Sequence, residues 1–151
     1  MNQTNQEKYD VLKLDNQLCF PLYACAKEIV RLYRKPLEPL GLTYTQYIVM
    51  LVFWEHGGMT ESQLGKIVHL DSGTLAPLLK RLEKQGFVKR IRPEENENKL
   101  YISLTEQGEK LKEMALSVPE EMADCITSMK AELISLKNML NKVLVTMEEE
   151  K

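Results

Sequence analysis

The stretch TESQLGKIVHLDSGTLAPLLKRLEKQG at residues 60–86 decides the fold. Its first four residues have the form of a capping box, with Thr60 as N-cap and Gln63 three residues on, and they open a short helix. After a turn of about three residues, Asp71 or Ser72 caps a longer helix, which ends at the glycine that closes the stretch. A short helix, a tight turn and a longer helix in succession form the helix-turn-helix pattern.

The longer helix is expected to have two different faces. One face is an apolar packing stripe of Leu75, Leu78, Leu79 and Leu82. The other face carries Ser72, Thr74, Pro77, Lys80, Arg81 and Lys84. Small polar side chains early in such a helix can approach base edges, and later Lys and Arg side chains can reach phosphates. We therefore predict that this second face binds double-stranded DNA, with a slight bend at the interior proline.

Two strand-like runs, 87–91 and 100–104, follow the longer helix and predict a β-hairpin, which in this position is a wing. We expect Arg90, Arg92, Asn98 and Lys99 of the hairpin to contribute to DNA binding. Residues 65–92 hold seven basic and two acidic side chains, although the whole chain has a net charge of −2. A local basic stretch is what phosphate neutralisation needs, but a solvated charged helix would give the same composition.

Amphipathic helices are predicted at both ends of the chain. The first starts near Asn16 or Gln17, because Pro21 is tolerated only in a first turn. Its apolar face consists of Leu18, Leu22, Cys25, Ile29 and Leu32. The last helix carries a heptad-like stripe of Ile126, Met129, Leu133, Leu136, Leu140, Val143 and Met147. Such a stripe suggests a seam between helices, with packing inside one domain as the alternative.

The predicted fold is therefore mainly α with a small β-hairpin wing, in one domain spanning 1–151. Residues 43–104 form the winged helix-turn-helix, opened by a further capping box at Thr43 and Gln46. The helical regions 14–40 and 105–147 are expected to form a homodimer, because the winged unit is nearly complete without them.

Composition sets limits on the class of protein. No run approaches the length of a membrane span, and the polar N-terminus lacks a signal-peptide core, so a cytoplasmic setting is expected. The three cysteines have no metal-ligand spacing and predict neither a zinc site nor a disulfide framework. We expect no metal and no other cofactor.

The sequence resembles the multiple-antibiotic-resistance regulator (MarR) family over nearly its whole length. The diagnostic stretches are GLTYTQY at 41–47, LAPLLKRLEKQG at 75–86 and ISLTEQG at 102–108. The resemblance implies a dimer that uses both terminal helices as its interface.

Within that family the segment LDNQLCFPLY at 14–23 is similar to the organic hydroperoxide resistance branch. The resemblance implies that Cys19 is oxidised by an organic hydroperoxide to a sulfenic acid and is held by tyrosines. Tyr23 corresponds to the tyrosine on the same helix. Tyr33 and Tyr44 correspond to two tyrosines that reach across from the partner subunit.

Cys19 also has a physical reason to react. In the predicted first turn, unsatisfied backbone N–H groups and the positive helix end favour the thiolate, which is the form that attacks a peroxide. Tyr23 lies four residues on, so its phenol shares the helix face and can donate a hydrogen bond to the thiolate. The competing interpretation is a small buried hydrophobe, the usual role of a free cysteine.

The other two cysteines bear on the later chemistry. Cys25 lies about 240° round the helix and about 9 Å along it from Cys19, too far for a disulfide, and we expect it in the core. Cys125 is expected near the start of the long last helix. The resemblance makes it a candidate resolving thiol for the partner's sensing cysteine, although some relatives rely on an external thiol instead.

The wing departs from the family pattern. An Asp-x-Arg motif is usual there, but this chain reads Asn96-Glu97-Asn98. Asn98 can still bond to a groove edge, and Lys99 is adjacent, so we predict a shallower salt dependence of DNA binding than the family norm.

Three functions are compatible with the sequence. The first is a redox-sensing repressor that releases operator DNA when Cys19 is oxidised. The second is a repressor released by a small aromatic ligand, with Cys19 structural. The third is a thiol peroxidase, which is disfavoured because the two histidines, His56 and His69, have no partnered acid in the sequence.

Overall fold

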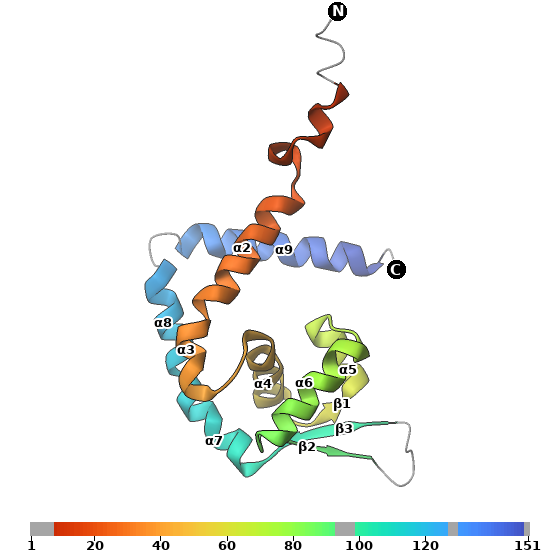
Figure 1. The fold of residues 1–151 in the computed structure, drawn as a ribbon, viewed down its shortest axis with the longest axis vertical. Helices are drawn as coiled ribbons and strands as arrows, with labels where there is room; N and C mark the ends of the chain where they lie inside the picture. The colour runs from red at the N-terminus through yellow and green to blue at the C-terminus, as the bar shows by residue number, and fades with distance from the viewer. Residues whose placement is uncertain (1–7, 93–98, 127–129, 150–151) are drawn as a thin grey trace, which may run out of the picture.

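The computed structural model describes residues 8–92, 99–126 and 130–149, and it consists mainly of helices with a small three-stranded antiparallel sheet at one edge (Figure 1). The 3-10 turns are η1 (Asp10–Leu12), η2 (Leu14–Asn16) and η3 (Glu38–Leu40). The helices are α2 (Cys19–Leu32), α3 (Arg34–Leu37), α4 (Tyr44–His56), α5 (Glu61–Val68), α6 (Ser72–Lys84), α7 (Glu106–Ala115), α8 (Ser117–Ile126) and α9 (Lys130–Glu149). The strands are β1 (Met59–Thr60), β2 (Val88–Ile91) and β3 (Tyr101–Leu104). The prediction of a mainly helical fold with a small wing is confirmed.

The helix-turn-helix forms because its caps set where the helices begin and its apolar stripe sets which face of α6 is buried. Thr43 and Gln46 cap α4, and Thr60 and Gln63 cap α5, each as a reciprocal capping box. The four leucines of α6 that were expected to form its packing stripe are all buried. They join side chains of α4, α5 and the sheet in one core, whose fully buried members include Val49, Met50, Phe53, Leu64, Leu79, Leu82 and Ile102.

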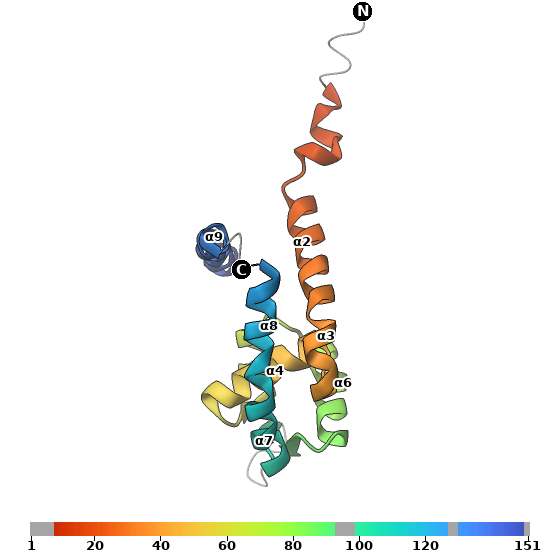
Figure 2. The same ribbon diagram turned by 90° about the vertical axis from the view of Figure 1, so that its left-hand side faces the viewer.

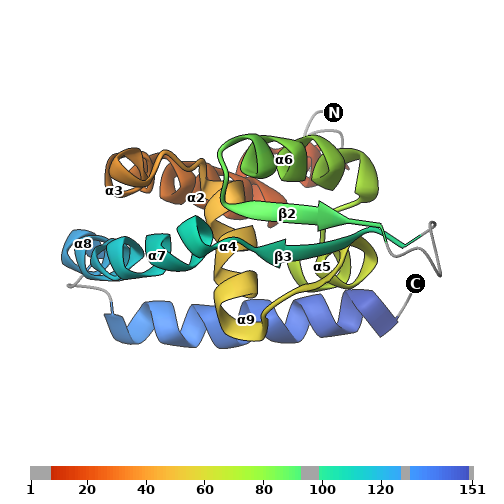
Figure 3. The same ribbon diagram turned by 90° about the horizontal axis from the view of Figure 1, so that it is seen from below.

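The sheet has the strand order β1-β3-β2, and the hairpin of β2 and β3 lies beside α6 (Figure 3). Val88 pairs with Leu104 in the hairpin, as a wing requires. The short strand β1 was not predicted, and it pairs Met59 with Ile102. A Cβ on the preceding Gly58 would lie 2.9 Å from the Ile102 carbonyl oxygen, so this approach of the two strands needs a glycine.

The terminal helices extend beyond the winged unit. α2 projects away from it and continues into the N-terminal 3-10 turns, while α9 lies apart from α2 (Figures 1 and 2). Both helices present exposed apolar side chains, among them Phe20, Leu22, Ile29, Val30, Leu32, Ile134, Met139, Val143, Leu144, Val145 and Met147. None of the described helices combines the length and the apolar character that a membrane span requires.

Three expectations about these helices are wrong. The stripe from Ile126 to Met147 does not lie on one helix, because α8 ends at Ile126 and α9 begins at Lys130; Met129 lies outside the described residues. Cys125 lies in the last turn of α8, not at the start of the last helix. Cys25 is exposed in the single chain, because α2 buries none of its residues against the rest of the described chain.

Candidate nucleic-acid interface and thiol site

The outer face of α6 is exposed along the length of the helix. Burial of the leucine stripe leaves the opposite face in solvent, and the six side chains predicted to bind DNA there are all exposed: Ser72, Thr74, Pro77, Lys80, Arg81 and Lys84. Pro77 lies inside the helix, which continues through it to Lys84. The small residues come first and the cations follow, as helix docking in a major groove requires.

Asp71 fixes the first turn of α6. Its carboxylate accepts a hydrogen bond from the Thr74 backbone N–H at 2.9 Å and another from the Thr74 hydroxyl at 3.0 Å. These two bonds hold the pKa of the Asp71 carboxyl below its usual range. Thr74, predicted to face DNA, is therefore held in place by a carboxylate that the sequence suggested only as a cap.

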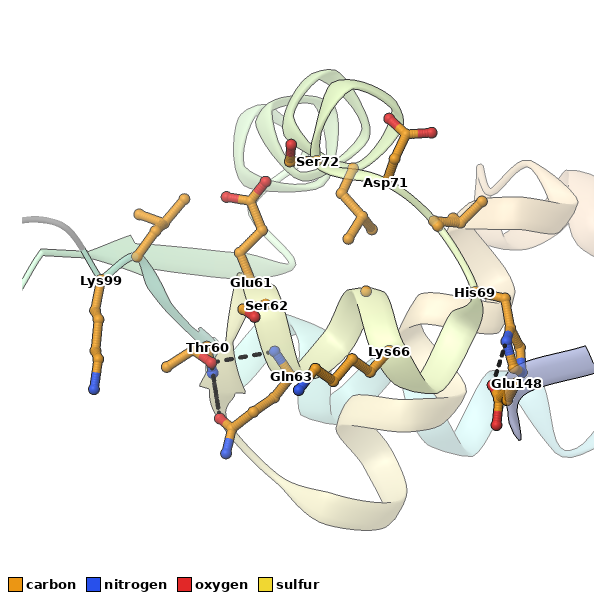
Figure 4. Close-up of a pocket in the computed structure, with 14 residues that line it drawn as sticks. Thr60, Glu61, Ser62, Gln63, Lys66, His69, Asp71, Ser72, Lys99 and Glu148 are labelled. Carbon is orange, nitrogen blue, oxygen red and sulfur yellow. Dashed lines mark hydrogen bonds and ion pairs between the residues drawn. The ribbon is translucent and has the colours of Figure 1, made fainter. Parts of the chain in front are cut away.

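The turn between α5 and α6 is compact. A Cβ on Gly65 would lie 2.8 Å from the Leu70 carbonyl oxygen, so only glycine lets the two helices approach this closely. His69 has a left-handed backbone with φ of 53°, and its Nδ1 lies 3.1 Å from Oε1 of Glu148 in α9. A cavity of about 1350 Å³ lies between α5, the start of α6, Lys99 just before β3 and Glu148 (Figure 4).

The base of the wing is clamped to α6. The Arg90 side chain donates through Nε to Glu83 at 2.7 Å, and the Arg90 backbone N–H donates to the same carboxylate at 3.2 Å. Arg90 was expected to reach DNA, but the structure places its guanidinium against Glu83. Arg92 and Lys99 are exposed at the ends of the hairpin, and Asn98 lies outside the described residues.

Cys19 is the first residue of α2, and it is exposed. The N-cap residue Leu18 makes no side-chain cap, so the first N–H groups of the helix have no cap from that side chain. Tyr23 follows one turn later and is exposed as well. The sequence therefore located the thiol correctly in the first turn of a helix, but α2 starts at Cys19 and not near Asn16 or Gln17, because residues 14–16 form a separate 3-10 turn.

Tyr33 and Tyr44 form a separate cluster at the other end of α2. Their ring centroids are 4.7 Å apart, and Tyr47 packs on Tyr33 at 5.9 Å. Burial, with a smaller contribution from Tyr44, raises the pKa of the Tyr33 phenol, and burial also raises the pKa of Tyr47. The phenols of Tyr33 and Tyr47 therefore stay protonated, and each can donate a hydrogen bond. Tyr47 was not among the predicted residues.

The other groups that the sequence singled out are less informative. The side chain of Cys125 lies outside the described residues, so the structure does not relate it to Cys19. His56 lies at the end of α4, with Nε2 3.7 Å from Glu55. Within the three described ranges, no three His, Cys, Asp or Glu side chains come together in a way that could hold a metal ion.

Comparison with known proteins gives a consistent result. The family described as transcriptional regulator SarA/Rot matches residues 31–114. The organic hydroperoxide resistance transcriptional regulator of Bacillus subtilis is 42% identical over 144 residues, which are 95% of this chain and 98% of that protein.

Among solved structures, AbfR of Staphylococcus epidermidis is similar in several states. Its reduced form bound to DNA matches with a TM-score of 0.70 and 34% identity, covering 88% of this chain and 96% of that one. An overoxidised form, also bound to DNA, matches with a TM-score of 0.71 and 35% identity over 91% and 98% of the two chains. A form with a disulfide matches with a TM-score of 0.63 and 35% identity over 97% and 99%.

Proposed function

The chain belongs to the MarR family of winged-helix transcriptional regulators, in its organic hydroperoxide resistance branch, and we propose that it is a repressor switched by Cys19. In the proposed cycle the reduced protein binds operator DNA, and oxidation of Cys19 by an organic hydroperoxide releases it. The relatives are regulators of transcription rather than enzymes, which argues against sustained peroxide turnover.

The observation that carries the proposal is the position of Cys19 as an exposed first residue of α2, one turn from Tyr23. The thiolate is the form of a cysteine that attacks a peroxide. The thiolate sulfur attacks the terminal oxygen of the hydroperoxide, an S–O bond forms, and the O–O bond breaks. The products are a sulfenic acid on Cys19 and an alkoxide that takes a proton to become an alcohol.

Dimerisation would complete the thiol site. The exposed apolar faces of α2 and α9 need a cover, and a second copy of the chain supplies matching faces. In an antiparallel arrangement of two α2 helices, Cys19 of one chain would approach Tyr33 and Tyr44 of the other. These two tyrosines already pack together as one unit, so they would approach the partner's thiol together.

Operator recognition would follow from the same symmetry. Two copies of α6 related by a two-fold axis enter successive major grooves and read a pseudo-palindromic site. The proposed contacts are the exposed residues of α6 together with Arg92 and Lys99 of the wing. Arg90 would act from its place against Glu83, where it holds the wing to α6.

The fate of the sulfenic acid is the next step. A second thiol attacks its sulfur, a disulfide forms and water leaves. Cys125 of the partner is our candidate for that thiol, with a small external thiol as the alternative. Cys125 lies in the last turn of α8, shortly before the chain enters α9, so a disulfide there would act directly on the dimerisation helices.

The second candidate function is a repressor released by a small aromatic ligand. The cavity between α5, α6 and the end of α9 is large enough for such a molecule. Most of the residues that line it are polar or charged types, including Glu61, Lys66 and Asp71, and this favours an aromatic acid or phenol less than a pocket of apolar residues would.

The test is a DNA-binding titration on the operator upstream of the chain's own gene, with and without an organic hydroperoxide. We expect wild type to lose binding on oxidation and Cys19→Ser to keep it. Cys25→Ser is the matched control, because it removes an exposed thiol from the same helix, and it should respond like wild type. If peroxide leaves wild type bound, the thiol switch is wrong and the ligand-released repressor takes its place.

A further inference from the structure

A chain of amide hydrogen bonds joins the first turn of α4 to the end of α6. Gln46 is only 5% exposed, and it is the sole buried polar side chain among the described residues. Its oxygen accepts from the Thr43 N–H at 2.9 Å, and its nitrogen donates to Gln85 Oε1 at 3.0 Å. Gln85 then donates to the Gly41 carbonyl oxygen at 2.8 Å. Every amide group that faces this joint therefore has a partner, and the bonds run in one direction.

The chain of bonds starts at Thr43 and ends at Gly41, and its middle member, Gln85, belongs to a different part of the molecule. Gln85 is the C-cap of α6, and Gly86, with φ of 82°, leads from it into the wing. Gly41 and Thr43 belong to the segment that precedes α4, and Tyr44 follows directly. The amide bonds thus connect the helix expected to read DNA with the backbone that carries a tyrosine of the proposed thiol site.

Among the described residues, no other hydrogen bond joins α6 or its C-cap to the segment 41–46. A groove of about 220 Å³ lies between them, lined by Thr43, Thr45, Gln46, Thr74, Pro77, Leu78 and Arg81. The buried leucines hold α6 to the core, but apolar packing is non-directional, whereas an amide bond has a preferred distance and angle. The two glutamines are therefore the directional link between the elements.

We propose that the Gln46–Gln85 pair is the joint through which the tyrosine cluster positions the recognition helix. The proposal rests on the redox function proposed above. When oxidation at the partner's thiol displaces Tyr33 and Tyr44, the segment 41–46 moves with Tyr44. Gln85 then moves the end of α6 and the base of the wing with it. Gln85 is a positioning residue, since it touches neither the thiol nor the expected DNA face.

The test compares Gln85→Met with wild type in the full-length protein. Methionine keeps the length of the side chain and removes both amide bonds. Three quantities are measured: operator affinity of the reduced protein, operator affinity after organic hydroperoxide, and the rate at which Cys19 loses reactivity toward a thiol probe. We expect the oxidation rate to be unchanged and the ratio of the two affinities to fall about fivefold to tenfold.

Gln63→Met is the control. Gln63 fills in α5 the capping-box position that Gln46 fills in α4, but it bonds only to Thr60, the N-cap of its own helix. It should weaken both affinities alike and leave their ratio at the wild-type value. Gln85→Glu is a second variant, because it can still accept from Gln46 but cannot donate to Gly41, and its ratio should lie between those of wild type and Gln85→Met. Melting temperatures establish that each variant is folded.

Two outcomes would overturn the joint, and they differ in meaning. If Gln85→Met keeps the wild-type ratio of reduced to oxidised operator affinity, the proposed joint is wrong and the thiol switch stands. The same conclusion follows if Gln63→Met lowers that ratio as much as Gln85→Met does. A wild-type protein whose affinity does not respond to peroxide removes the switch itself, and the role of the joint falls with it.

Discussion

Cys19 and Tyr33 stand at opposite ends of one helix, as the first residue and the C-cap of α2. At 1.5 Å per residue the two positions are about 21 Å apart along the axis. The exposed thiol and the partly buried tyrosine cluster therefore cannot meet within one chain. Only a second copy can bring them together, and this makes the dimer a condition for the proposed sensor rather than an addition to it.

The first prediction concerns that dimer. Ile29 lies on the exposed apolar face of α2, and Ile29→Glu should prevent a partner from covering this face because the carboxylate would be buried unpaired. We expect the mass measured by light scattering to fall to that of one chain and operator affinity to fall at least about tenfold. Lys27→Glu, about 200° round the same helix, is the control. A variant with the wild-type mass would contradict the assignment of this face.

The second prediction concerns Cys125. After treatment with an organic hydroperoxide, wild type should run as a cross-linked dimer on a non-reducing gel. The cross-link should disappear in Cys19→Ser and in Cys125→Ser and persist in Cys25→Ser. If oxidised wild type runs as a single chain although its Cys19 has reacted, the resolving thiol is external, and Cys125 has no part in the switch.

The third prediction concerns pH. The pKa of Tyr33 is raised above its ordinary value of 10.0, so the folded state holds this proton more tightly than the unfolded state. The resulting stabilisation is fully present below pH 10 and is lost as the pH rises through the folded pKa. In melts between pH 9 and 11, Tyr33→Phe should therefore lose less stability than wild type. Equal slopes would show that Tyr33 does not contribute to the alkaline transition.

The fourth prediction concerns the cap of α6. Asp71→Ala removes both bonds to Thr74 and should weaken operator binding about threefold to tenfold, while Asp71→Asn keeps a capping oxygen and should stay near wild type. The pKa of Asp71 is lowered, so its contribution is present above pH 3.8 and is lost as the pH falls through the folded pKa. Binding titrations at neutral pH decide the point. Equal affinities for the two variants would show that the cap does not position Thr74 for DNA.

The fifth prediction concerns the wing, where the sequence lacks the usual arginine. Asn98→Arg should strengthen operator binding and steepen the plot of log affinity against log salt by about one unit, as one more phosphate contact would. Titrations between low and moderate salt measure both quantities. Unchanged affinity and slope would show that this part of the wing does not touch DNA.

The parts of the fold that were predicted correctly depend on local patterns. The capping boxes and the leucine stripe of α6 each lie within a few turns of chain, and periodicity determines them. The exposure of Cys25 could not be predicted in this way. A helix face that packs on the core of its own chain has the same apolar pattern as a face that is covered only by a second chain. The break between Ile126 and Lys130 was missed for a similar reason, since the apolar spacing continues across it.

The missed features of the site are mostly long-range. The bond of Arg90 to Glu83 joins a strand to a helix, and the bond of Gln46 to Gln85 joins residues far apart in the sequence. Neither pair follows a helical or strand period. The sequence therefore identified the exposed residues of α6 and the exposed Cys19, but not the residues that hold the elements in position behind them.

The strand order β1-β3-β2 also has a consequence for how the chain folds. β1 is two residues long and pairs with β3 across a stretch of chain that contains α5, α6 and β2. Closing a loop of that length has an entropic cost that the two pairs of β1 offset only in part. We therefore expect β1 to pair late in folding. Since Thr60 also caps α5, the helix-turn-helix and the wing complete their folding together, as one cooperative unit.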